Sequence, residues 1–246
     1  MEKKKIIVFL FVLIMVLSVC SCDSGKLVLS GNVFIQKFSE DFTTVKYERF
    51  LSDLTFLEPG RNIDGSSNID GNGKITGGKF NYSIGEPASL NIIDEEFFLG
   101  IETWYGTAYT DFRTSENVMG FALERFPVDS DDFFFLTNSK SKMNVKSNSY
   151  KNRNDKVFYI YVDRNVTISA AGNIENFYHG VEDHVMATKD FNLKLRAGWN
   201  TVTVRREVTG TYSGTYRNPT RIEQDIVETV SRGNPSLRWI LVERPK

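Results

Sequence analysis

Short runs of alternating apolar and polar residues recur along the chain, and turn-forming residues separate them about every ten positions. The alternation is strictest over 191–195 and 199–208, which flank Arg196-Ala197-Gly198 and predict a hairpin. Residues 157–162 are apolar throughout, as in a buried strand, and residues 237–242 predict a last strand. Further strands are predicted over 26–36, 75–84, 89–93, 97–107, 120–126, 132–136 and 166–169.

Two segments instead have apolar residues at helical spacing. Residues 220–223 form a Thr-Arg-Ile-Glu capping box, and Gly233 and Pro235 follow as stop signals. The aliphatic stripe between these signals, Ile222, Ile226 and Val230, predicts a short C-terminal helix. Residues 45–57 are rich in β-formers, but their apolar residues also fall at helical spacing, which predicts a second short helix.

Two polar segments interrupt this pattern. Glycine-rich 61–74 predicts a loop, and 139–155, rich in Ser, Asn and Lys, predicts a long hairpin or a mobile loop. The whole pattern predicts a mainly β fold, a β-sandwich of jelly-roll or immunoglobulin/transthyretin-like type with one short C-terminal helix. Because no Pro/Ser-rich linker divides it, we expect a body over 31–246 that is one domain or two closely packed β subdomains.

The N-terminal residues have the order of features of an export signal. Basic residues 3–5 precede an unbroken apolar run over 6–17, which suits a signal peptide and is short for a membrane span. We therefore expect residues 1–21 to be a signal peptide. An ordinary signal peptide without lipid and an uncleaved anchor helix are the alternatives.

The end of this segment resembles a lipobox. Val19-Cys20-Ser21-Cys22 has an aliphatic residue, two small residues and a cysteine, as in bacterial lipoproteins. The resemblance implies a lipid on Cys22 and a lipidated tether over 22–30. Cleavage before Cys20 fits less well, because Val19 is bulky for the residue that precedes the cut.

Charge and cysteine content narrow the function classes. Removal of residues 1–21, which carry three lysines and one glutamate, takes two positive charges from a net charge of −1 and leaves −3. A slightly acidic body has no electrostatic footprint for nucleic acid and no basic face for an anionic membrane. Cys20 and Cys22 are the two cysteines of the chain, so the body has no disulfide, thiol nucleophile or cysteine-based metal site.

The hairpin sequence resembles one in known proteins. Residues 193–200, Leu-Lys-Leu-Arg-Ala-Gly-Trp-Asn, are similar to a Leu-x-Leu-x-x-Gly-Trp-Asn hairpin of functionally uncharacterised bacterial lipoproteins, and a related hairpin recurs in jelly-roll carbohydrate-binding modules. Together with 157–169, the resemblance implies a β-sandwich. It implies no site, because the shared residues form a turn and its packing.

One segment is similar to a calcium loop. Residues 68–75 match the first eight positions of an EF-hand or dockerin loop, with Asn68, Asp70 and Asn72 as oxygen ligands. Two departures weaken the match: the first position is asparagine, and Lys79 stands where a bidentate glutamate should close the coordination shell. A glycine-rich connection into the next strand is the alternative.

A second metal candidate holds both histidines of the chain. His179, Glu182 and His184 lie within six residues and could bind zinc if the segment is a loop. A solvated turn whose histidines make ordinary hydrogen bonds is the alternative.

Aromatic residues provide a possible stacking site. Trp104, Tyr105 and Tyr109 could stack on the face of a sugar ring, and packing in the core is the alternative. Glu95 and Glu96 are adjacent, so on a strand they point to opposite faces and cannot flank one glycosidic bond. The sequence has no Gly-x-Ser-x-Gly elbow, His-Glu-x-x-His motif or P-loop.

These features predict a membrane-anchored envelope lipoprotein whose body is a non-catalytic binding or structural module for a glycan or a protein, with no nucleic-acid partner. An envelope hydrolase and a calcium-stabilised carbohydrate-binding module are the alternatives, and calcium is the one cofactor that the sequence suggests. The outer membrane or the cell surface is the favoured location. Asp23 resembles an inner-membrane retention signal, so the periplasmic face of the inner membrane is the alternative.

Overall fold

Strands make up most of the structure, a computed structural model that describes residues 25–40, 43–56, 69–95, 97, 111–175, 182–214, 219–233 and 238–243. The first nine are β1 (Leu27–Phe38), β2 (Val45–Arg49), β3 (Leu54–Thr55), β4 (Ile69–Thr76), β5 (Lys79–Pro87), β6 (Asn91–Ile92), β7 (Arg113–Thr114), β8 (Met119–Leu123) and β9 (Arg125–Pro127). The others are β10 (Phe133–Val145), β11 (Ser149–Val162), β12 (Val166–Glu175), β13 (Glu182–Leu195), β14 (Gly198–Gly214), β15 (Pro219–Arg232) and β16 (Arg238–Glu243). The predicted mainly β, sandwich-like fold is therefore confirmed.

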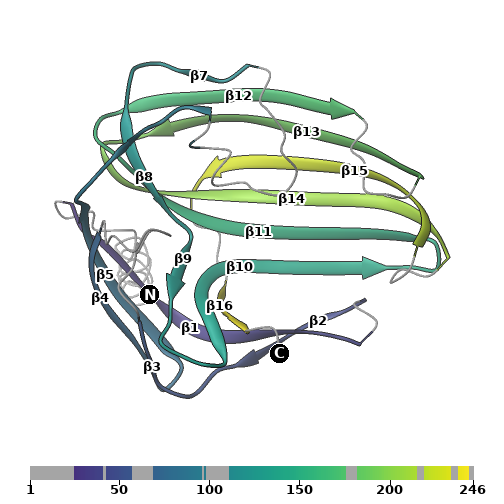
Figure 1. Cartoon of the computed structure of the whole chain (residues 1–246), viewed down its shortest axis with the longest axis horizontal. Coiled ribbons are helices and arrows are strands. Elements are labelled where there is room, and N and C mark those ends of the chain that lie inside the picture. The colour runs from purple at the N-terminus through teal and green to yellow at the C-terminus, as the bar shows by residue number, and fades with distance from the viewer. Residues whose placement is uncertain are drawn as a thin grey trace, which may run out of the picture.

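The strands form one hydrogen-bonded network that folds into two layers. Its order is β3-β4-β5-β1-β16-β10-β11-β14-β15-β13-β12-β7. Strand β10 belongs to both layers, because residues 133–139 pair with β16 and residues 139–145 pair with β11. In Figure 1 the long strands from β10 to β12 form one curved layer, and β1, β3, β4 and β5 lie below it.

Two apolar clusters fill the fold. The first lies between the layers and is rich in aromatic rings: Phe80, Tyr82, Phe126, Tyr159 and Trp239. Ring centroids in this cluster lie as close as 4.3 Å, for Phe80 and Trp239. The second cluster lies on the other face of the large layer and includes Phe158, Ile160, Ile168, Leu193 and Val202. The even-numbered residues of β11 and β14 lie on this face, which we call the inner face.

One end of the inner face is closed by the chain itself. Strand β7 pairs with β12 and strand β8 pairs with β11, so residues 113–123 cross from one strand to the other. The Ser115 N–H donates to the Thr167 carbonyl at 2.9 Å, and the Met119 N–H donates to the Asp163 carboxylate at 3.1 Å. The second apolar cluster occupies this closed end, and a more polar region follows it along the same strands.

The predicted C-terminal helix is wrong, because residues 219–232 form strand β15. A spacing of four is also a multiple of two, so the aliphatic stripe lies on one face of a strand as well as on one face of a helix. Strand β15 pairs antiparallel with β14 and parallel with β13, and lies between them. The predicted hairpin is therefore wrong in its pairing, although the two strands and the turn at 196–197 are present.

Other segments also form strands where the sequence predicted a helix, a loop or a tether. Residues 45–57, predicted to contain a short helix, instead contain β2 and β3, in agreement with their β-forming composition. The loop predicted over 61–74 gives way to β4 at Ile69, and β1 begins at Leu27, four residues before the predicted start of the body.

Three predictions of pattern are confirmed. The polar stretch 139–155 is a long hairpin of β10 and β11, in which Val145 faces Tyr150. Residues 157–162 are the buried end of β11. The last strand, β16, lies between β1 and β10 and so ties the C-terminal residues into the sheet.

Candidate functional site

Several predicted site residues lie outside the described part of the chain. They are the lipidation residue Cys22, the metal candidates Asn68 and His179, and the stacking candidates Trp104, Tyr105 and Tyr109. The roles assigned to them stay predictions.

The other four metal candidates lie on strands. Asp70 and Asn72 belong to β4, and the backbone of Asn72 faces Ser83 of β5. Glu182 and His184 belong to β13, whose backbone pairs with β15. Both segments are extended, whereas the metal predictions assumed loops. Within the residues that the structure describes, no three His, Cys, Asp or Glu side chains are grouped as metal ligands.

A row of polar residues crosses the inner face at right angles to the strands. Ser141 of β10 faces Asn154 of β11, Asn154 faces Arg206 of β14, and Arg206 faces Glu228 of β15. We call these four residues the polar row. Neighbouring strands are about 4.8 Å apart, so the row spans roughly 14 Å.

The polar row stands between aliphatic residues. On β14, Val204 and Val208 lie two residues before and after Arg206, on the same face. On β15, Ile226 and Val230 flank Glu228 in the same way, and Ile226 is buried. The row is therefore a polar band across a face that is otherwise largely apolar on these two strands.

The charged members of the row are paired and largely shielded from solvent. The Arg206 Nε lies 3.7 Å from the Glu228 Oε1, and their side chains are 17% and 9% exposed. Next to the row, the Lys156 ammonium donates to the Glu124 carboxylate at 3.0 Å. The Asn154 Oδ1 is buried and has no hydrogen-bond partner among the described residues. An unsatisfied buried acceptor costs free energy unless a ligand or a water supplies a donor.

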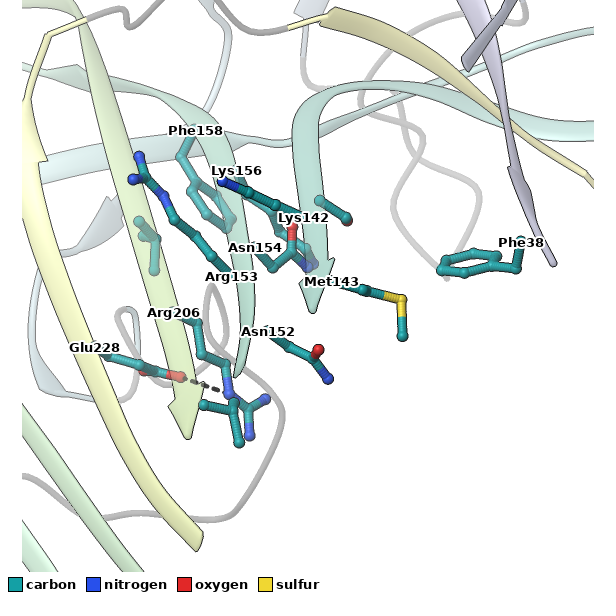
Figure 2. A pocket seen from close by; sticks show the side chains of 13 residues that line it. Phe38, Lys142, Met143, Asn152, Arg153, Asn154, Lys156, Phe158, Arg206 and Glu228 are labelled. Atoms are coloured by element: carbon teal, nitrogen blue, oxygen red, sulfur yellow. Dashed lines mark ion pairs between the residues drawn. The ribbon is translucent and has the colours of Figure 1, made fainter. Parts of the chain in front are cut away.

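A cavity of about 400 Å³ opens over the polar row. All four members of the row line it, and its apolar lining comes from Phe38, Met143, Phe158, Val204 and Val208. Figure 2 shows Arg206 and Glu228 side by side, with Asn152, Asn154, Lys156 and Phe158 on the neighbouring strand and Met143 and Phe38 at the right. Hydrogen-bonding groups and apolar side chains therefore share one hollow of ligand size.

The opposite face of the same strands carries a different charged group. Asp155 accepts hydrogen bonds from Arg153 at 2.7 Å and from Arg205 at 2.9 Å, and its side chain is 4% exposed. Burial raises the pKa of Asp155, but the hydrogen bonds and charges of the two guanidinium groups outweigh it and lower that pKa overall. This carboxylate has its partners within the sheet, so its role is structural.

The sequence carried part of the signal for the polar row. Asn152, Asn154 and Lys156 alternate within the segment predicted as a hairpin or loop, and Arg206 stands between two valines at a spacing of two. What the sequence could not supply was the register, because Ser141 and Glu228 join the row only through strand pairing, and Glu228 lay in the predicted helix.

Comparisons with family models, curated proteins and solved structures found no match to this chain. Among the described residues, no helix has both the length and the apolar character needed to cross a membrane.

Proposed function

We propose that this chain is an exported bacterial lipoprotein, anchored in the cell envelope through Cys22, whose β body is a non-catalytic module that binds a small ligand over the polar row. The lipobox-like sequence at 19–22 supports the anchor. The cavity over the polar row supports the binding role.

The polar row is the observation that carries the binding role. Apolar residues at positions 206 and 228 would stabilise this face more. The free energy that a buried ion pair loses through dehydration is often larger than the attraction between its two charges. A purely structural ion pair is the competing explanation. A structural pair needs no cavity, whereas this one lines a hollow together with the unsatisfied Asn154 Oδ1.

The site and the proposed anchor lie towards opposite ends of β1. Cys22 and Leu27 are five residues apart, so the chain between them spans at most about 17 Å. Strand β1 has 12 residues, so its two ends are roughly 35 Å apart. Phe38, which lines the cavity, is at the end of β1 away from the anchor. The site would therefore lie at the end of β1 that is far from the lipid.

The anchor can be tested by labelling cells with an alkyne fatty acid. Wild-type protein should incorporate the label and sediment with membranes, and Cys22→Ala should lose the label. Cys20→Ala is the matched control and should keep it. Label on Cys22→Ala, or none on wild type, would contradict the anchor. Protease treatment of intact and lysed cells then separates a surface location from a periplasmic one.

The binding role can be tested on the full-length protein in detergent by hydrogen-exchange mass spectrometry with a library of sugars, organic acids, amines and short peptides. We expect one class to protect the peptides of 150–158 and 202–210. The double variant with Arg206→Leu and Glu228→Leu should lose that protection. The variant Glu207→Gln, whose substitution lies on the opposite face of β14, should retain it. Protection only elsewhere, or release of a cleaved product, would contradict a non-catalytic site over the row.

A further inference from the structure

We infer that the ligand held over the polar row is a neutral, hydroxyl-rich molecule, a saccharide of one or two rings. This inference rests on the proposed function and names the ligand class for the same cavity. It follows from the hydrogen-bonding capacity, the charge balance and the apolar borders of the row.

The four members of the polar row differ in whether they donate hydrogen bonds, accept them or do both. The Ser141 hydroxyl and the Asn154 amide can each donate and accept, whereas Arg206 only donates and Glu228 only accepts. A ligand that satisfies all four must carry groups that both accept and donate within a short distance. Neighbouring hydroxyl groups do this. A fully ionised carboxylate or phosphate group only accepts, so it would leave the Asn154 Oδ1 without a donor and would meet the charge of Glu228.

Charge balance also favours a neutral ligand. Two cationic side chains line the cavity from the inner face, namely Lys156 and Arg206. Both already have carboxylate partners: Lys156 with Glu124, and Arg206 with Glu228. An anionic ligand would have to compete with these carboxylates. A cationic ligand would have to compete with Lys156 and Arg206 for the same two carboxylates.

The borders of the row suit the apolar surface of a sugar ring. Val204 and Val208 flank Arg206, and Met143 and Phe158 complete an apolar lining next to the polar groups. A pyranose ring presents hydroxyl groups at its edge and C–H groups on its face, so it can contact both kinds of side chain at once. The 14 Å that the row spans across four strands leaves room for two linked rings.

The test uses full-length protein in a detergent without a sugar headgroup, because such a headgroup would compete for the site. The neutral probes are maltose, cellobiose, lactose and N,N′-diacetylchitobiose, together with a printed array of neutral glycans. The charged probes are citrate, glucose 6-phosphate, spermidine and glycyl-leucine. Binding is measured by calorimetry, and its location by hydrogen exchange over 150–158 and 202–210.

We expect at least one neutral saccharide to bind and to protect both segments. Its Kd should change less than twofold between 50 and 500 mM NaCl, because a neutral ligand has no charge for salt to screen. Asn154→Leu should weaken binding at least tenfold, and Asn154→Asp is the second variant if the first melts early. Glu207→Gln should bind within twofold of wild type.

Two results would overturn the inference in distinguishable ways. If a charged probe protects the polar row and no neutral saccharide does, the ligand class is wrong and the proposed binding site stands. If no probe of any class protects the row, both the saccharide inference and the proposed function fall.

Discussion

Trp239 of β16 packs directly over Gly31 of β1, so that a Cβ built at Gly31 would stand 2.5 Å from the indole Cδ1. The indole N–H donates to the Ser30 carbonyl at 3.1 Å, which fixes the ring in place. Since Trp239 also stacks on Tyr159 in the aromatic cluster, it has no room to withdraw.

Gly31→Ala should therefore destabilise the fold through overpacking, by about 1–3 kcal/mol. The measurement is the free energy of unfolding from urea titration of the full-length protein. Val28→Ala is the control, because Val28 is on the same strand and 65% exposed, and its change should stay within about 0.5 kcal/mol. Equal effects of the two substitutions would refute the tight contact with Trp239.

Asp155 should make the fold sensitive to acid. Its pKa is lowered in the folded protein, since the hydrogen bonds and charges of Arg153 and Arg205 outweigh the effect of burial. A lowered pKa means that the stabilisation is complete above the unfolded pKa, about 4. This stabilisation is lost as pH falls through the folded pKa.

Asp155→Asn should accordingly lower the free energy of unfolding at pH 7 by about 2–3 kcal/mol, because two guanidinium groups lose their charged partner. It should also flatten the decline in stability below pH ~4. Urea titrations between pH 3 and pH 7 provide the check. Glu207→Gln, which breaks the more exposed pair with Lys151, should cost less than about 1 kcal/mol. An unchanged acid profile in Asp155→Asn would assign the decline to other groups.

Replacing one residue of the Arg206–Glu228 pair should lower the free energy of unfolding, whereas replacing both should change it little. Arg206→Leu and Glu228→Leu alone should each destabilise by about 2–4 kcal/mol, because each removes the opposite charge from a largely shielded ion pair. The double variant should lie within about 1 kcal/mol of wild type, since the neighbours on β14 and β15 are aliphatic. A double-mutant cycle by urea titration measures the coupling. Strictly additive losses would mean that the pair is not coupled.

Asn200 should stabilise the turn between β13 and β14. Its Oδ1 accepts from the Arg196 N–H at 3.0 Å, and its Nδ2 donates to the carbonyls of Arg196 at 2.7 Å and Gly198 at 2.9 Å. Asn200→Ala should cost about 2–3 kcal/mol, because three partly buried backbone groups lose their partner. Asn165→Ala, which removes one exposed acceptor for Ala197, should cost less than half as much in the same unfolding assay.

The pattern of alternation was sufficient to predict the fold class but not the order of the strands. Phe80, Tyr82 and Ile84 alternate in the sequence and are all buried in β5. The stripe of Ile222, Ile226 and Val230 fits both periods, and the capping box favoured the wrong one. Local propensity could not decide, because the insertion of β15 between β13 and β14 is a tertiary event.

The candidate site was harder to predict for the same reason. Each member of the polar row looks ordinary in its own segment: Ser141 and Asn154 in a polar hairpin, Arg206 in an alternating strand, Glu228 near the end of the chain. Only strand register brings them into one line, and register depends on contacts between residues far apart in sequence.

The place of β16 has a consequence for how the chain folds. This strand pairs in parallel with β1 and antiparallel with β10, as in Val33 with Trp239 and Leu136 with Leu241. A chain that emerges N-terminus first leaves the edges of β1 and β10 open until its last strand arrives. Such non-local pairing makes folding slow. The two layers cannot lock together while residues 238–243 are missing. If the chain is exported as we propose, this delay keeps the precursor unfolded for its passage through the membrane.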